Sequence, residues 1–180
     1  MKQRLADYVA DFLAARGVTD VFSVVGGGAM HLNDALGHNP RLHVTYNHHE
    51  QACAIAAEAY ARLENKIAAV CVTTGPGGTN ALTGVVGGWL DSIPMFIVSG
   101  QVRYDTTAGT PCSTPVRRCA PWATRSTTSP KSVQYMTKFA AMLEDPKDIR
   151  YLLEKAWHLA TTGRPGPVWL DIPVNFQGGY

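Results

Sequence analysis

The sequence has few charged side chains and almost no net charge. Of its 180 residues, 16 are Lys or Arg and 14 are Asp or Glu, a formal net charge of +2. No basic stripe is visible, so nothing favours a nucleic-acid partner. No apolar run reaches the roughly 20 residues of a membrane-spanning helix, and the first residues lack the pattern of a signal peptide. We therefore expect no nucleic acid, no membrane and a cytoplasmic protein.

Cysteine is also scarce, and its spacing indicates no metal or redox motif. No C-x-x-C pair is present. Cys53 falls in an expected helix and Cys71 in an expected buried strand, which favours reduced thiols in the core and a cytosolic environment. The four cysteines are Cys53, Cys71, Cys112 and Cys119.

Two common ligand-binding motifs are missing. Gly26-Gly27-Gly28 follows an expected strand, but a dinucleotide-binding fingerprint needs another glycine where His31 stands. We interpret these glycines as a tight turn under a ligand or a neighbouring subunit. The adjacent His48 and His49 do not form an H-E-x-x-H zinc motif with Glu50, so no metal site is predicted.

Short β-rich segments alternate with segments of helical periodicity along the chain. This alternation predicts an α/β fold: a doubly wound, mainly parallel six-stranded sheet with helices on both faces, in a single domain over residues 1–180. The expected strands are 21–25, 42–46, 67–73, 95–99, 133–139 and 168–172. The expected helices are 3–16, 31–36, 49–62, 79–90 and a last one that Asp145-Pro146 opens.

Glu50 stands where a short strand gives way to an Ala-rich helix. In an open α/β sheet this junction faces the crevice at the carboxyl ends of the strands, where ligands bind. The helix dipole also favours a carboxylate in the first turn. From the residues alone, Glu50 is either a ligand-binding group or an acid that only stabilises its helix.

A second strand-to-helix junction, 74–80, reads Thr-Gly-Pro-Gly-Gly-Thr-Asn. Glycine lets backbone N–H groups approach a ligand closely, although many α/β loops share this composition. The next helix holds Gly84, Gly87 and Gly88, each of which costs up to about 1 kcal/mol. They indicate a closely packed partner, either a helix across a dimer interface or the sheet of the same domain.

Together these motifs resemble the N-terminal pyrimidine-binding domain of thiamine diphosphate enzymes of the acetolactate synthase type. The matching runs are 26–28, 48–51, 59–62, 75–80, 91–94, 99–102 and 162–168. The resemblance implies that Glu50 is the catalytic acid at the pyrimidine ring and that Gln101 points towards the reacting centre. It further implies a set of cofactor-binding residues: Gly26, Gly27, Gly75, Pro76, Gly77 and Asn80.

The resemblance also implies partners. The cofactor is thiamine diphosphate with Mg²⁺, which a diphosphate-binding domain holds through a Gly-Asp-Gly…Asn motif absent from this sequence. We expect the pyrimidine-binding half of a 2-oxo acid decarboxylase or carboligase, in a homodimer or larger homo-oligomer. The diphosphate-binding domain would belong to the parent protein or a separate subunit. The alternatives are a non-catalytic dimerising α/β module and a truncated product without activity of its own.

Two places depart from the family pattern. Residues 108–131 are rich in proline and show no periodicity, which is typical of a disordered loop. The family has a Met-Gly-Asp-Gln-Glu-like run there, and a pair of compensating frameshifts would explain the difference. Lys138 matches a basic residue near the active site, but Phe139 stands where the family has His. This difference weakens the match to a true acetolactate synthase.

Overall fold

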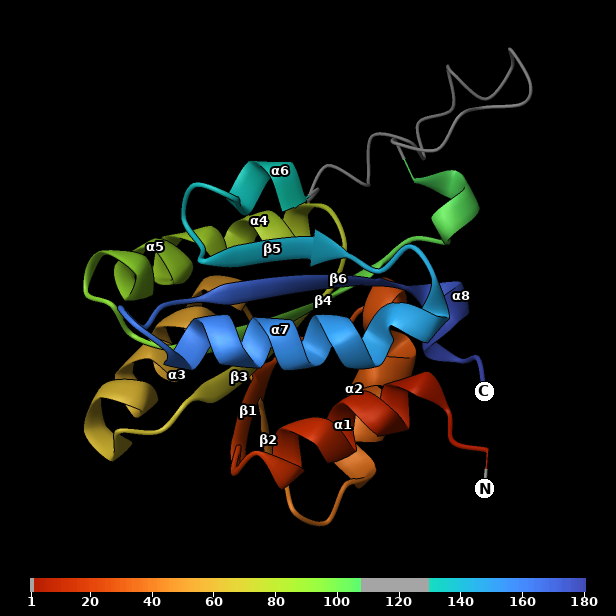
Figure 1. Cartoon of the computed structure of the whole chain (residues 1–180), viewed down its shortest axis with the longest axis horizontal. Helices are drawn as coiled ribbons and strands as arrows, with labels where there is room; N and C mark the ends of the chain where they lie inside the picture. The colour runs from red at the N-terminus through yellow and green to blue at the C-terminus, as the bar shows by residue number, and fades with distance from the viewer. Residues whose placement is uncertain (1, 108–129) are drawn as a thin grey trace.

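A six-stranded sheet forms the centre of the computed structural model, which describes residues 2–107 and 130–180 (Figure 1). The strand order is β2-β1-β3-β4-β6-β5, and every neighbouring pair is parallel. The strands are β1 (Asp20–Ser23), β2 (His43–Tyr46), β3 (Ala68–Val72), β4 (Met95–Gln101), β5 (Phe139–Met142) and β6 (Val168–Pro173).

Helices cover both faces of this sheet, as predicted. The face that packs against α1 and α7 is the near one in Figure 1, where α7 crosses in front of the strands. The opposite face packs against α3 and α5. The helices are α1 (Leu5–Ala15), α2 (Met30–His38), α3 (Glu50–Glu64), α4 (Pro76–Asn80), α5 (Leu82–Leu90), α6 (Pro130–Val133), α7 (Ile149–Thr161) and α8 (Val174–Gln177), with 3₁₀ turns η1 (Gly27–Ala29), η2 (Tyr104–Thr106) and η5 (Pro146–Asp148).

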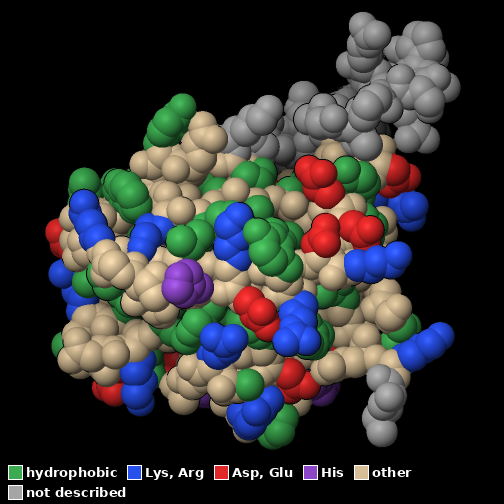
Figure 2. Space-filling model, viewed as in Figure 1, with side chains coloured by type: hydrophobic (Ala, Val, Ile, Leu, Met, Phe, Trp, Pro, Cys, Tyr) green, Lys and Arg blue, Asp and Glu red, His purple; other side chains and the backbone are tan. Residues whose placement is uncertain are grey.

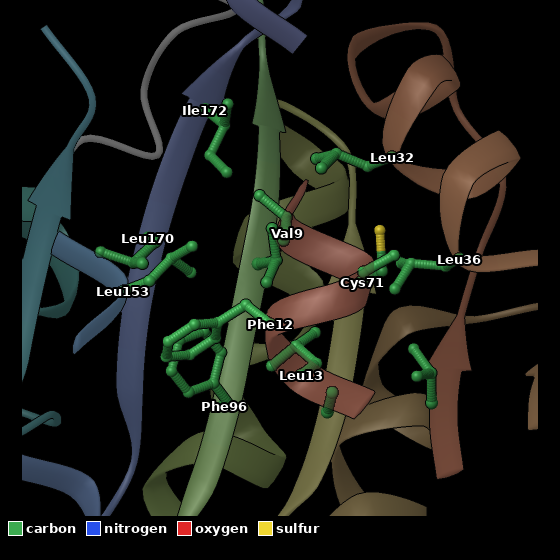
Figure 3. Packing of buried hydrophobic residues seen from close by; sticks show 14 of the residues in the cluster. Val9, Phe12, Leu13, Leu32, Leu36, Cys71, Phe96, Leu153, Leu170 and Ile172 are labelled. Atoms are coloured by element: carbon green, nitrogen blue, oxygen red, sulfur yellow. The ribbon is translucent and has the colours of Figure 1, made fainter. Parts of the chain in front are cut away.

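The central strands are buried on both sides, which explains their nearly continuous apolar sequence. Along β3, Ala69 and Cys71 face the core shared with α1, while Val70 and Val72 face the core shared with α3. Figure 3 shows the first core, where Phe12 of α1 lies close to Phe96 of β4. Each face of the sheet therefore buries its own helical layer.

The near face of the molecule carries no broad hydrophobic or single-sign area. Figure 2 shows hydrophobic side chains interspersed with Lys, Arg, Asp and Glu over this side. Within the described part of the chain, no helix has both the length and the apolar character needed to cross a bilayer.

The order of strands creates one switch point, between β1 and β3. These strands are neighbours in the sheet although β2 lies between them in the chain. The chain therefore leaves the end of β1 towards one side and the end of β3 towards the other. In open α/β sheets a crevice forms at the carboxyl ends of such a pair. The η1 turn follows β1 and the Gly75 turn follows β3, so both glycine segments border this crevice.

The fifth strand was predicted wrongly. It was expected at 133–139, but the structure has α6 at Pro130–Val133 and β5 at Phe139–Met142. Val133 is the last residue of α6 and is buried, and its carbonyl accepts a hydrogen bond from Thr137 Oγ1 at 2.9 Å. The short Phe-Ala-Ala-Met run has weak strand propensity, so its pairing with β6 decides its conformation.

One predicted helix is divided in the structure, and the last helix begins where it was expected. The helix expected at 79–90 begins earlier, at Pro76, and divides at Ala81 into α4 and α5. The last helix begins with η5, where the Asp145 side chain accepts a hydrogen bond from Lys147 N at 2.9 Å, and continues as α7. The expectations for 108–129 lie outside the described residues, whereas Pro130 at the end of that segment begins α6.

Candidate functional site

A cleft of about 710 Å³ lies at the carboxyl edge of the sheet, beside the switch point. Its volume falls within the range of small-molecule sites, roughly 300–1,000 Å³. The glycine turn after β1, the turn after β3 and the chain after β4 all contribute to its walls. The lining residues are Gly27, Gly28, Thr73, Thr74, Pro76, Val102, Arg103, Thr106 and Val174.

Glu50 is the first residue of α3 and is nearly buried, at 9% exposure. His49 caps this helix, because its side chain accepts a hydrogen bond from Gln51 N at 3.2 Å. The helix N-terminus stabilises the negative charge of the Glu50 carboxylate. Asn80 Nδ2 donates to Glu50 Oε2 at 3.0 Å, and Oε1 lies 3.2 Å from where a Cβ on Gly77 would be. The structure thus brings Glu50, Gly77 and Asn80 together.

The turn after β3 explains how α4 comes to face Glu50. Gly75 has φ 64° and ψ −125°, a backbone conformation that residues with a side chain rarely adopt. Pro76 follows at the first helical position, where its fixed φ suits a helix start. Gly75 and Pro76 therefore place the next turn of the chain against the carboxylate.

The glycine turn after β1 is held close to the end of β3. A Cβ on Gly26 would lie 2.5 Å from Thr73 Cβ, and a Cβ on Gly28 would lie 2.9 Å from Thr73 Oγ1. Gly28 N also donates to Thr73 Oγ1 at 3.1 Å. Contacts within the chain account for these two glycines. Gly27 has nothing within 4 Å of its Cβ position and lines the cleft.

Gln101 ends β4 and is almost completely buried, at 1% exposure. Its Oε1 accepts hydrogen bonds from Val102 N at 2.9 Å and from the Thr74 hydroxyl. Its Nε2 donates to Asp171 Oδ2 at 3.4 Å. The amide therefore lies behind the cleft wall, and Thr74 and Val102 stand between it and the cleft.

Asp171 is a polar residue of this region that sequence reasoning missed. It lies in β6 with no exposed surface, and its Oδ1 accepts a hydrogen bond from Trp169 Nε1 at 2.9 Å. Burial raises the pKa of Asp171 to about 7, although hydrogen bonds from Trp169, Ser99 and Gln101 act in the opposite direction. The available signal was one acid inside an otherwise apolar strand.

Other sequence expectations concern residues away from the cleft. Lys138 lies just before β5, at the amino end of the strands, and its Nζ donates to Thr162 O at 2.6 Å. It is therefore at the opposite edge of the sheet from the cleft in this chain. No group of three or more His, Cys, Asp or Glu side chains within 2–107 and 130–180 is arranged to hold a metal ion.

The glycines of α5 have an explanation inside the domain. A Cβ on Gly84 would lie 2.6 Å from Ala54 Cβ and 2.7 Å from Ile55 N, so α3 and α5 approach each other closely there. A Cβ on Gly88 would lie 2.5 Å from Met95 Sδ. A Cβ on Gly87 would have nothing within 4 Å. Of the three glycines of α5, Gly87 is therefore the one that packing among the described residues does not explain.

This arrangement defines a doubly wound α/β module whose switch-point cleft has a helix-terminal carboxylate beside it. Comparison with known proteins gives the family: the chain belongs to the family described as "Thiamine pyrophosphate enzyme, N-terminal TPP binding domain", which matches residues 3–120.

Curated relatives agree with this assignment. The chain is 34% identical to a chloroplastic acetolactate synthase of Arabidopsis thaliana over 96% of its own length and 24% of the relative's. It is 36% identical to the acetolactate synthase large subunit of Haemophilus influenzae over 94% of its own length and 28% of the relative's. The chain thus spans about a quarter of the length of the curated relatives it matches.

Proposed function

We propose that this chain is the pyrimidine-binding part of a thiamine diphosphate-dependent enzyme that decarboxylates or joins 2-oxo acids, as an acetolactate synthase does. The observation that carries the proposal is the position of Glu50. Glu50 begins α3, is nearly buried, and contacts Asn80 and Gly77 of α4, the helix whose first residue, Pro76, lines the switch-point cleft. A carboxyl in a site with little water can hold or share a proton with a bound ring.

The residues present suit the pyrimidine end of the cofactor. Asn80 holds one oxygen of the Glu50 carboxylate, which orients the other oxygen towards Gly77. Because Gly77 has no side chain, α4 can pack closely against Thr73 and Glu50, and Glu50 would hydrogen-bond a ring nitrogen. Thiamine diphosphate supplies the carbon nucleophile of the reaction, and the protein supplies orientation and proton transfer.

The other expected residues keep supporting roles in this proposal. Gly27 and Pro76 line the cleft, Gly26 and Gly75 stand next to them in the two turns, and Gln101 acts from behind the cleft wall. A diphosphate-binding domain of the parent protein or of a separate subunit would hold Mg²⁺ and the phosphates. The proposal also includes a homo-oligomer, a 2-oxo acid substrate and a cytoplasmic location, which the two free, buried thiols of Cys53 and Cys71 support.

The test uses a protein that joins this chain to a matching diphosphate-binding domain and compares Glu50→Gln with wild type. Gln keeps the shape and can still hydrogen-bond, but it cannot share the proton. We expect activity to fall by about a hundred- to ten-thousand-fold, as is typical of general acid–base catalysis. Hydrogen–deuterium exchange at the thiazolium carbon of the bound cofactor should slow in parallel.

Glu64→Gln is the matched control, because Glu64 ends the same helix and is exposed. It should leave both rates unchanged. If Glu50 only stabilised the start of α3, Glu50→Gln would cost about 0.3–1 kcal/mol of folding free energy and leave exchange at the wild-type rate. That result would refute the catalytic assignment, and a joined protein that never binds thiamine diphosphate would refute the proposed function itself.

A further inference from the structure

The carboxyl group of Asp171 is buried inside the sheet, and none of its partners among residues 2–107 and 130–180 is a cation. β6 lies between β4 and β5, and Asp171 has no exposed surface. Burying a carboxylate costs free energy unless hydrogen bonds compensate it. Its partners are Trp169 Nε1 at 2.9 Å, Gln101 Nε2 at 3.4 Å and the Ser99 hydroxyl. β6 and β4 supply these three groups, all of them neutral, and β5 places Met142 beside Asp171.

Asp171 dictates which way the Gln101 amide points. An ionised carboxylate only accepts hydrogen bonds, so the NH₂ group of the amide must face it. The carbonyl oxygen of Gln101 then faces the other way, where it accepts from Val102 N at 2.9 Å and from the Thr74 hydroxyl. Thr74 and Val102 both line the cleft. One buried acid is therefore connected to two groups of the cleft wall through one side chain.

We propose that Asp171 is a positioning residue of the cleft: its carboxylate fixes the Gln101 amide, and Gln101 in turn holds the Thr74 hydroxyl and the Val102 main chain at the cleft wall. The connection concerns only residues of this chain. It rests on the proposed function solely for the use made of the cleft.

This role predicts that the cleft wall responds to the protonation of a residue it does not touch. A protonated Asp171 carries a donor as well as an acceptor, so the bond to Gln101 Nε2 loses its charge assistance and the carboxyl group no longer dictates which way the amide points. Burial raises the pKa of Asp171 to about 7. The change in the cleft wall should therefore occur near neutral pH.

The experiment is a pH titration of the 180-residue chain by nuclear magnetic resonance. The signals are the Trp169 indole N–H, which reports on Asp171 directly, and the Val102 amide and Thr74 methyl group, which report on the cleft wall. We expect the three signals to shift with one common midpoint near pH 7. A Trp169 signal that titrates while Val102 and Thr74 stay constant would overturn the proposal.

Three variants separate this coupling from other titrations. Asp171→Asn should remove the shared midpoint from every signal, and Val102 or Thr74 titrating unchanged in it would contradict the proposal. Gln101→Leu should leave Trp169 titrating and release Val102 and Thr74 from that midpoint, which keeps the test decisive if Asp171→Asn does not fold. Asp148→Asn, at an exposed position, should change none of them. These outcomes are independent of thiamine diphosphate binding, so they fail or succeed separately from the proposed function.

Discussion

Two glycines of α5, three residues apart, should respond to the same substitution in opposite ways. Replacing a glycine inside a helix by alanine normally stabilises the helix by up to about 1 kcal/mol. At Gly87 no atom lies within 4 Å of the new Cβ, so Gly87→Ala should realise this gain. At Gly84 the new Cβ would lie 2.6 Å from Ala54 Cβ and 2.7 Å from Ala54 C and Ile55 N.

The size of the loss at Gly84 follows from what the methyl group meets. The obstacles belong to the backbone of α3 and to a Cβ attached to it, so no side-chain rotation can relieve the overlap. α3 and α5 would have to move apart, and overpacking of this kind typically costs about 1–3 kcal/mol. After a helix gain of about 1 kcal/mol is subtracted, Gly84→Ala should destabilise the chain by up to about 2 kcal/mol. Because both alanines gain the same helix propensity, the two variants should differ by the overpacking cost, about 1–3 kcal/mol.

Urea unfolding of both variants and the wild type, followed by circular dichroism, measures this difference. For a chain of this size, 1 kcal/mol corresponds to about 2–4 °C in Tm, so thermal unfolding provides a second reading. Equal stabilisation by both alanines would show that α3 and α5 do not approach as closely as the structure places them. The close contact would then not explain Gly84.

Three further predictions use other contacts. Burial raises the pKa of Asp171 from 3.8 to about 7. Between these pH values the folded chain binds more protons than the unfolded chain. The contribution of Asp171 to the free energy of unfolding is therefore fully present below about pH 4 and is lost as the pH rises through 7. Urea unfolding of wild type against Asp171→Asn should show a difference that changes by roughly 4 kcal/mol over this range, and a pH-independent difference would contradict the buried charge. In thermal unfolding, Gly26→Ala should destabilise the chain by about 1–3 kcal/mol, because its Cβ would lie 2.5 Å from Thr73 Cβ. Gly27→Ala should be neutral in the same assay. Equal effects of the two substitutions would be inconsistent with the packing of the glycine turn after β1. The chain should self-associate through α3 and α5, where Ile55, Leu63 and Leu90 are exposed. Sedimentation should show dimers or larger species, and Ile55→Glu should weaken this association. A monomer at high concentration would count against this interface.

Much of the fold could be predicted because local sequence and tertiary pairing agree. The central strands β3, β4 and β6 are apolar runs that also lie in the middle of the sheet. β5 was misplaced because its four residues, Phe139–Met142, become a strand only through pairing with β6. The division of the predicted helix at Ala81 had no clear sequence signal, since it follows from how α4 turns towards Glu50.

Only part of the candidate site could likewise be predicted from the sequence. Glu50 and the glycine turn at Gly75 stand at strand-to-helix junctions, and the rule for open α/β sheets predicts that such junctions face one crevice. Asp171 follows no such rule. Its partner Gln101 is 70 residues away in sequence, and only the register between β4 and β6 brings Trp169, Asp171 and Gln101 into one network. A single acid in an apolar strand carries no information about that register.

The last residues before α4 connect the separate parts of the site. Thr73 packs against Gly26 and binds Gly28 N, Thr74 binds Gln101, and Gly75 turns the chain towards Glu50. Thr73 and Thr74 thus contact the β1 turn and the β4 end, and Gly75 leads into α4, whose Asn80 contacts Glu50 at the start of α3. Since a shift of one residue exchanges the two faces of a strand, changing the register of β3 would break all three connections together. The fully buried β3 fixes this register, so the core that stabilises the fold also determines the geometry of the cleft.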